Sequence, residues 1–129
     1  MSNENTTSIY GFTIVINNGA ANGSIAVYNN GSLVHSASSN YADNNWHYLC
    51  LIRDSSGSRL VIDGNQQGVT NTEQATSLWD AGVPKNWYIG SSLSFPGREL
   101  SGNIDELRVT KGVRYTGNPT SPTQAFPNI

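Results

Sequence analysis

The sequence predicts an all-β protein, an antiparallel sandwich of two sheets that is most like a jelly roll. Three observations lead to this prediction. Runs rich in β-branched and aromatic residues recur along the chain at the spacing of about eight short strands. Turns rich in Asn, Gly and Pro separate the runs. No stretch shows the apolar periodicity of a helix of about ten residues.

The first strands are predicted in the N-terminal third of the chain. Residues 9–16 read IYGFTIVI, in which large apolar side chains alternate with Thr13 and Val15. The runs 24–28 and 32–38 flank the sequence Asn-Asn-Gly. Asn-Gly between two strand-like runs is a strong hairpin signal, so these two runs are predicted to pair.

A strand covered on both faces is predicted in the middle of the chain. After the polar connector 39–45, residues 46–54 read WHYLCLIRD. Alternation places Trp46 and Cys50 on one face and His47 with two leucines on the other. Both faces are largely apolar, so we expect a central strand, with Trp46 in the core and Cys50 as a small buried hydrophobe.

The remaining elements are a returning strand, a connector and two closing strands. A turn reading SSGS precedes the returning strand, and Asp63-Gly64 opens the next turn. The predicted ranges are 59–64 for the returning strand, 71–86 for the irregular connector, and 87–93 and 99–111 for the closing strands.

Composition limits the class of protein. The 129 residues make one domain, with residues 1–8 as a flexible lead, 9–118 as the sandwich and 119–129 as a Pro-rich extended tail. Charged residues are 12% and the net charge is −2, without a basic run, so we expect no nucleic-acid partner. Neither a secretory leader nor an apolar span long enough for a bilayer is seen, so no membrane insertion is expected. The single cysteine rules out an internal disulfide and suits a reducing cytosol.

The adjacent acids in NIDELRV, residues 103–109, resemble the carboxylate pair of a glycosidase. Strand periodicity sends Asp105 and Glu106 to opposite faces. Such enzymes need both carboxyl groups around one bond, about 5–5.5 Å or about 6.5–9.5 Å apart. We therefore expect a structural brace, in which Glu106 pairs with Arg108 and Asp105 accepts hydrogen bonds, and no enzyme activity.

Histidines and turn acids offer weaker candidates. His35 and His47 lack the Ser or Cys partner and the orienting group that nucleophilic catalysis needs. Asp43 in YADNN and Asp63 in DGN carry hard oxygen ligands that suit Ca²⁺. Ordinary turns have the same composition, so no metal or cofactor is expected, and Asp43 and Asp63 are the weak candidates if Ca²⁺ binds.

Aromatic side chains are the candidates for contact with a glycan or a partner. Trp79 in SLWDAG and Tyr41 in SNYADN lie in predicted connectors, where exposed aromatics often mark interfaces. The alternative for Trp79 is that it caps the core under its loop. Trp46 and Trp87 begin predicted strands and are expected in the core.

Two segments carry a family resemblance. NWHYLCLIRDSSGSRLVIDGNQQG resembles the Trp-His strand and the following hairpin of LamG-like jelly rolls, which are concanavalin A-like lectin/glucanase domains. WYIGSS with GNIDELRVTKGVRYTGNPTSPTQAFP resembles the end of the same domain, and the two segments extend the match over residues 45–128. This closing signature is frequent in bacteriophage tail, fibre and virion-surface proteins.

The resemblance also has departures. The Glu-x-Asp-x-x-Glu run of the family's glucanases is absent from this chain. Domains of this kind begin with further strands before the equivalent of residue 9, so the resemblance implies that the usual N-terminal strands are lacking. A missing strand leaves an open sheet edge, which an oligomer or a larger assembly would cover. Some LamG-type domains hold Ca²⁺ at the rim.

Two functions follow as expectations. The first is a non-enzymatic structural or adhesion subunit of a phage virion, such as a tail-fibre, receptor-binding or head-surface decoration protein. It would assemble in the host cytoplasm as a homo-oligomer, for which a trimer is the first expectation. Its partners would be other virion proteins and also a cell-surface glycan. The alternative is an extracellular, lectin-like carbohydrate-binding module excised from a larger bacterial surface or secreted protein.

Overall fold

The computed structural model describes residues 2–4, 12–16, 23–29, 32–71, 86–91 and 99–127. These ranges contain no helix, and so none long and apolar enough to cross a membrane. They contain eight strands: β1 (Ser2–Glu4), β2 (Phe12–Ile16), β3 (Ile25–Asn29), β4 (Ser32–Ala37), β5 (Leu49–Asp54), β6 (Gly57–Ile62), β7 (Asn65–Asn71) and β8 (Asn86–Tyr88).

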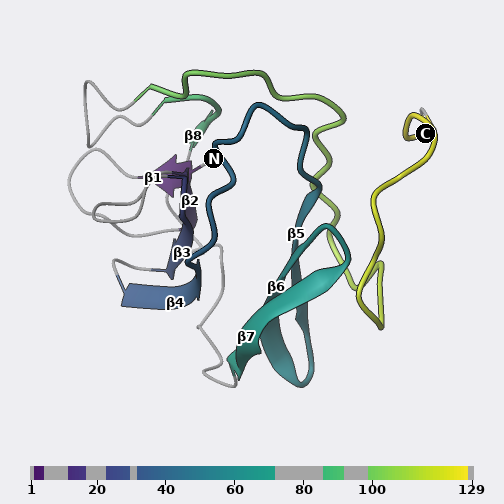
Figure 1. Cartoon of the computed structure of the whole chain (residues 1–129). Helices are drawn as coiled ribbons and strands as arrows, with labels where there is room; N and C mark the ends of the chain where they lie inside the picture. Colours follow the sequence, from purple (N-terminus) through teal and green to yellow (C-terminus); the bar gives the residue numbers. More distant parts are fainter. Residues whose placement is uncertain are drawn as a thin grey trace.

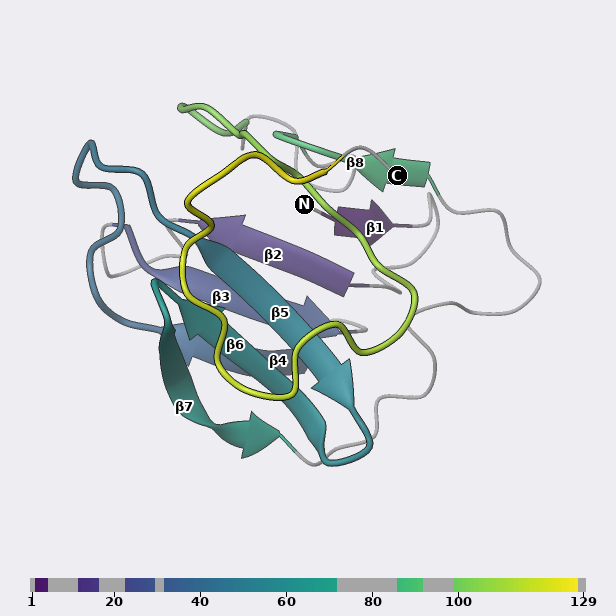
Figure 2. The ribbon, with the colours of Figure 1, turned by 90° about the vertical axis from the view of Figure 1, so that its right-hand side faces the viewer.

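The strands form two antiparallel sheets that face each other. A five-stranded sheet has the order β4-β3-β2-β1-β8, and a three-stranded sheet has the order β5-β6-β7. The two sheets stand apart in Figure 1 and overlap in the turned view of Figure 2. The predicted all-β sandwich of two antiparallel sheets is confirmed.

The five-stranded sheet contains both a confirmed hairpin and a missed strand. β3 and β4 are paired, and the pairing ends at the turn with Asn29 opposite Ser32, as the Asn-Gly signal predicts. β1 lies between β2 and β8, so the prediction of a flexible lead over residues 1–8 is wrong for Ser2–Glu4. Ser and Asn have low strand propensity, and pairing with both neighbours makes this segment a strand.

The three-stranded sheet is built from two tight hairpins. β5 and β6 pair from Leu49 opposite Ile62 to Asp54 opposite Gly57. Between β6 and β7, Asp63 and Gly64 have φ angles of 50° and 81°, the left-handed pair that a type I′ turn requires. The turn at Asp63-Gly64 is thus confirmed, but β7 was missed because its glutamines and glycine read as a loop.

The core lies between the inner faces of the two sheets. Its buried apolar cluster is Ile25, Val27, Ala37, Leu60 and Ile62. His35 of β4 is buried in the same layer, and its Nε2 lies 2.9 Å from Ser58 Oγ of β6, which links the two sheets. Burial lowers the pKa of His35, because the charged imidazolium is poorly solvated there.

The outer face of the three-stranded sheet is covered by the C-terminal segment, residues 99–127. Figure 2 shows this segment running in front of β5 and β6. Buried Arg59 of β6 pairs with Asp54 and donates from Nη2 to the carbonyl oxygen of Tyr115 at 3.1 Å. Hydrogen bonds from Ser56 and then from Arg59 lower the pKa of Asp54 to about 2. β5 is therefore covered on both sides as predicted, although it is an edge strand and not a central one.

The closing strands differ most from the prediction. Residues 99–111 form no strand, and β8 spans only part of the predicted 87–93. Glu106 has a φ of 50°, and its N–H is held at 2.8 Å by the carboxylate of Asp105, so the extended backbone is interrupted there. The predicted tail, as far as residue 127, has no strand or helix, and its first residue, Pro119, is buried.

Candidate functional site

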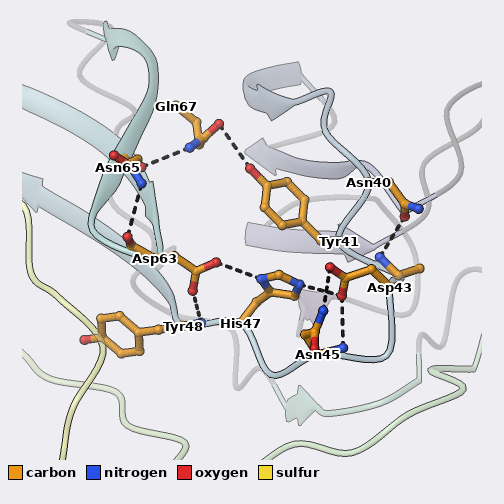
Figure 3. Close-up of polar contacts among 10 residues, drawn as sticks. Asn40, Tyr41, Asp43, Asn45, His47, Tyr48, Asp63, Asn65 and Gln67 are labelled. Atoms are coloured by element: carbon orange, nitrogen blue, oxygen red, sulfur yellow. Dashed lines mark hydrogen bonds and ion pairs between the residues drawn. The ribbon is translucent and has the colours of Figure 1, made fainter.

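A densely hydrogen-bonded polar region is the clamp loop, residues 40–48, which lies in the connection from β4 to β5 (Figure 3). It is fixed to the start of β3 by the Tyr41 N–H, which donates to the Gly23 carbonyl oxygen at 3.0 Å. Within the loop, the Ala42 N–H donates to Asn40 Oδ1 at 2.9 Å, the local bond of an Asx turn. The loop therefore has a defined conformation without belonging to a sheet.

His47 lies between two carboxylates that are distant in sequence. Its Nε2 lies 2.9 Å from Asp43 Oδ1, and its Nδ1 lies 2.7 Å from Asp63 Oδ2 in the β6–β7 turn. The other oxygen of Asp63 accepts from the Tyr48 N–H at 2.7 Å. Asp43 also accepts from the backbone and the side-chain amide of Asn45, at 2.9 and 3.0 Å. These contacts clamp the loop onto the hairpin (Figure 3).

The charges of the cluster favour a protonated histidine. Hydrogen bonds to Asp63 and Asp43 raise the pKa of His47, because two carboxylates stabilise the imidazolium. Hydrogen bonds from Asn45 and then from His47 hold the pKa of Asp43 well below its usual range. With both ring nitrogens engaged, His47 has no free nitrogen to accept a substrate proton. The arrangement suits a structural clamp better than a general base.

Stability should therefore depend on the charge of His47. A raised folded-state pKa stabilises the protein fully below the unfolded value of about 6.5, and this contribution is lost as the pH rises through the folded pKa. The lowered pKa of Asp43 stabilises the folded protein at pH values above the unfolded pKa of about 3.9. We expect the difference in unfolding free energy between wild type and His47→Gln to be largest near pH 5–6 and to shrink towards pH 9, measured by urea titration. The lowered pKa of buried His35 changes stability with pH in the opposite direction, but His35 is present in both proteins, so its contribution cancels in the difference. A difference that does not change with pH would contradict the clamp.

The two weak Ca²⁺ candidates are the carboxylates of this clamp. Asp43 and Asp63 are brought together only through His47, and each already accepts hydrogen bonds from protein donors. In the described ranges, no group of three or more His, Cys, Asp or Glu side chains is arranged to hold a metal ion. The chemistry of the cluster is therefore that of an ion-paired hydrogen-bond network.

Tyr41 is a packing residue. It is half-buried against the apolar core, its hydroxyl donates to Gln67 Oε1 at 3.3 Å, and its ring meets that of His47 edge to face at 5.2 Å between centroids. Tyr41 is half-buried and not fully exposed, because it links the clamp loop to β7. Its contact with a glycan or a partner stays a prediction. Trp79, the other predicted contact, lies outside the described residues.

Trp46 is the exposed aromatic of the clamp loop. Its exposed fraction is 69%, so the prediction that it lies in the core is wrong. β5 begins only at Leu49, and the strand alternation from which that prediction came does not extend back to Trp46. Cys50, predicted on the same face, is only partly buried, and burial raises the pKa of its thiol. The structure describes only the backbone pairing of Trp87, in β8.

The predicted brace at the C-terminal acids holds a different partner. Glu106 accepts the Phe126 N–H at 2.7 Å, and the Arg108 guanidinium lies over the Phe126 ring at 5.3 Å. Among the described residues Glu106 and Arg108 form no ion pair with each other, so the predicted direct pairing is wrong. Both instead hold the tail at Phe126, and Asp105 accepts a backbone hydrogen bond as predicted. Phe126 carried no sequence signal for this role.

The comparisons with known proteins identify the family. A family model described as the concanavalin A-like lectin/glucanases superfamily matches residues 1–116. The chain belongs to this superfamily. The match adds residues 1–44 to the resemblance found over residues 45–128. Among curated proteins and solved structures, none matches the chain significantly.

Membership of the superfamily raises the choice between lectin and glucanase chemistry. A glycosidase needs two carboxyl groups that face one glycosidic bond. Asp43 and Asp63 share His47, Asp54 pairs with Arg59, and Glu106 holds the Phe126 N–H. These carboxylates are all engaged within the protein, which leaves them poorly suited to protonate or attack a sugar.

Proposed function

We propose that the chain is a non-enzymatic adhesion domain, which acts by contact between its surface and a partner. The observation that carries this proposal is a run of exposed apolar side chains in the C-terminal segment: Ile104, Leu107, Val109 and Val113. A contiguous exposed apolar patch marks an interaction surface, and we propose that these four side chains contribute to one. The engaged carboxylates described above support a binding role over a catalytic one.

The setting that we propose is a bacteriophage particle. The closing segment GNIDELRVTKGVRYTGNPTSPTQAFP, which resembles that of phage tail and virion-surface domains, contains the exposed apolar run. Subunits of such particles work as closed symmetric oligomers, and a trimer is the first expectation. In this proposal the protein is a tail-fibre, receptor-binding or head-surface subunit, folded in the host cytoplasm and then located in the virion.

Self-association is the direct test. We expect the purified chain to form an oligomer at micromolar concentration, measured by light scattering on a sizing column. Val109→Glu should shift the mass towards the monomer, because a charge cannot be buried unpaired at an interface. Val69→Glu is the matched control, since Val69 is 84% exposed and lies outside this run.

A monomeric wild type would contradict the oligomer. Equal effects of the two substitutions would contradict the assignment of the interface to the C-terminal run. The virion setting is checked separately by mass spectrometry of purified particles from cells that express the gene. The absence of the protein from the particles would overturn that setting.

The second candidate function is carbohydrate binding by a lectin-like module of a larger extracellular protein. Superfamily membership is compatible with it, and the specific observation in its favour is the exposed indole of Trp46. Binding of oligosaccharides by a protein that stays monomeric would favour this function over the virion subunit.

A further inference from the structure

One edge of the three-stranded sheet is left open. The residue pairs that exchange backbone hydrogen bonds alternate along an antiparallel ladder. The Asp63 N–H donates to the Tyr48 carbonyl oxygen at 2.9 Å, which sets this alternation for β5. Every second residue of β5 therefore directs its backbone N–H and carbonyl groups away from β6, namely Leu49, Leu51 and Arg53. Among the described residues, no group bonds to these outward backbone groups.

The exposure of two core leucines shows that this edge is uncovered. Leu60 and Ile62 of β6 are almost completely buried. Leu49 and Leu51 of β5 pack against the same core cluster, yet both are only partly buried. The difference follows from their place at the edge, because no described strand lies on the far side of β5 to cover them.

The other edges of the described sheets are protected. On β7, the carbonyl oxygens of Asn65 and Gly68 accept side-chain amides at 3.0 and 3.2 Å, and the pairing with β6 shifts register. The pairing of β4 also shifts register, and its Val34 carbonyl oxygen accepts from Asn71 Nδ2 at 3.2 Å. β8 has only three residues. Irregular, capped or short edges resist further pairing, so β5, a regular strand of six residues, is the edge suited to accept another strand.

The segment 104–109 has the properties of the strand that this edge lacks. In an extended chain, alternation would place Asp105, Leu107 and Val109 on one face. The exposed fractions of Leu107 and Val109 are 44% and 59%, so their own sandwich does not cover them. Glu106 interrupts the segment with a left-handed φ of 50°, which is strained for a residue with a Cβ. Extension of the segment as a strand would relieve this strain and bury apolar surface.

One register matches the segment to the edge. In an antiparallel pairing with Leu107 opposite Leu51, apolar side chains meet on the core face of the sheet. The same register sets Asp105 opposite Arg53, which forms no ion pair with any described residue. A parallel pairing would set Val109 opposite Arg53 instead. Opposite charges across two strands stabilise their pairing, so the antiparallel register is favoured.

We propose that the segment 104–109 of one copy of the chain adds as a strand to the β5 edge of a second copy. In its own chain the segment lies between two anchors. Before it, the Leu100 N–H donates to the Gly90 carbonyl oxygen at 2.7 Å, and after it the Tyr115 carbonyl oxygen accepts from Arg59 at 3.1 Å. The apolar side chains that are exposed between these anchors are available to a neighbouring molecule.

This exchange leads to a closed oligomer. Each copy donates one strand and accepts one, so a ring of copies leaves no β5 edge open. The exchange gives up the contacts of Glu106 and Arg108 with Phe126, and the backbone hydrogen bonds of the new ladder replace them. The inference rests on the self-association proposed above, and it names the two segments that make the contact.

Arg108→Cys tests the register through the native Cys50. The register sets position 108 opposite Cys50, in a pair whose Cα atoms lie about 4.5 Å apart, which a disulfide can span. In oxidised glutathione, we expect disulfide-linked oligomers on a non-reducing gel, with the link between position 108 and Cys50 identified by mass spectrometry. Val109→Cys is the matched control, because its side chain points to the opposite face and should not link to Cys50.

Charge reversal is a second test that does not depend on a thiol. Arg53→Glu should weaken self-association about threefold or more, because two negative groups then lie opposite each other. Asp105→Arg should weaken it similarly, and the double substitution should restore the affinity of the wild type. Light scattering over a dilution series measures the dissociation constants.

Four results would overturn the exchange. A disulfide between position 108 and Cys50 of the same chain would place the segment on its own edge. A disulfide between the Cys50 side chains of two wild-type copies would show that two β5 edges meet each other. An oligomer with neither the expected link nor the charge rescue would exclude this pairing and leave the proposed self-association standing. A monomeric wild type would exclude both.

Discussion

Replacing Gly23 by alanine is expected to destabilise the protein by roughly 2–5 kcal/mol. A Cβ at this position would lie 2.0 Å from Asn40 Oδ1, 2.6 Å from the Ala42 nitrogen and 2.9 Å from the Tyr41 nitrogen. The Asn40 side chain can rotate away, but the two backbone nitrogens belong to the start of the clamp loop. A φ of +76° adds the strain of a left-handed conformation. Urea unfolding, followed by circular dichroism, measures the loss.

Gly68→Ala is the matched control for this substitution. Gly68 has a similar φ of +67°, but nothing lies within 4 Å of the place that a Cβ would take there, so only the backbone strain applies. We expect a loss of about 1–2 kcal/mol at this position. If Gly23→Ala and Gly68→Ala lower the free energy of unfolding equally, the close contact between the start of β3 and the clamp loop is not the reason that glycine is required at position 23.

Truncating Leu60 to alanine is the other substitution with a large expected effect. Leu60 is completely buried at the centre of β6 and belongs to the core cluster between the sheets. Leu→Ala at such sites costs about 3–5 kcal/mol, from lost apolar burial and the cavity that remains. The unfolding midpoint in urea should fall while the dependence of the free energy on urea stays the same.

Val69→Ala shows whether the position or the lost apolar surface causes this effect. Val69 lies in β7 and is 84% exposed, so its truncation should change the free energy of unfolding by no more than about 0.5 kcal/mol. A small effect at Leu60 would mean that the two sheets do not pack through this residue.

The parts of the fold that were predicted correctly depend on local signals. The apolar runs within residues 46–54 and 59–64 predict two strands separated by a turn, and the structure pairs them as β5 and β6. Asp63-Gly64 specifies its turn through the left-handed φ that both residues adopt. Each of these features is decided by neighbours within a few residues, so a single sequence contains the information.

The errors arise where tertiary contacts override local pattern. Residues 99–111 alternate like a strand, yet they form neither a strand nor a helix, and Glu106 among them takes a left-handed φ of 50°. β1 and β7 have the composition of loops and become strands by pairing with neighbours. Strand alternation predicts Trp46 in the core, but the strand concerned, β5, begins only at Leu49.

The candidate site shows the same limit. The sequence indicates Asp43 and Asp63 as weak ligands and His47 as a weak catalytic candidate, each separately. Their meeting depends on the clamp loop lying against the β6–β7 turn, which no spacing in the sequence reveals. The exposure of Trp46 follows from the same arrangement, because the clamp fixes the backbone on either side of it.

The contact between Arg59 and the Tyr115 carbonyl has a consequence for biosynthesis. Arg59 emerges from the ribosome long before Tyr115, and until then one face of the β5–β6 hairpin lacks its cover. Pairings between such distant residues form slowly, and an uncovered sheet is prone to aggregate. Completion of this sandwich is therefore delayed until the segment around Tyr115 has been synthesised, and the exposed hairpin is a point at which a nascent chain would need protection.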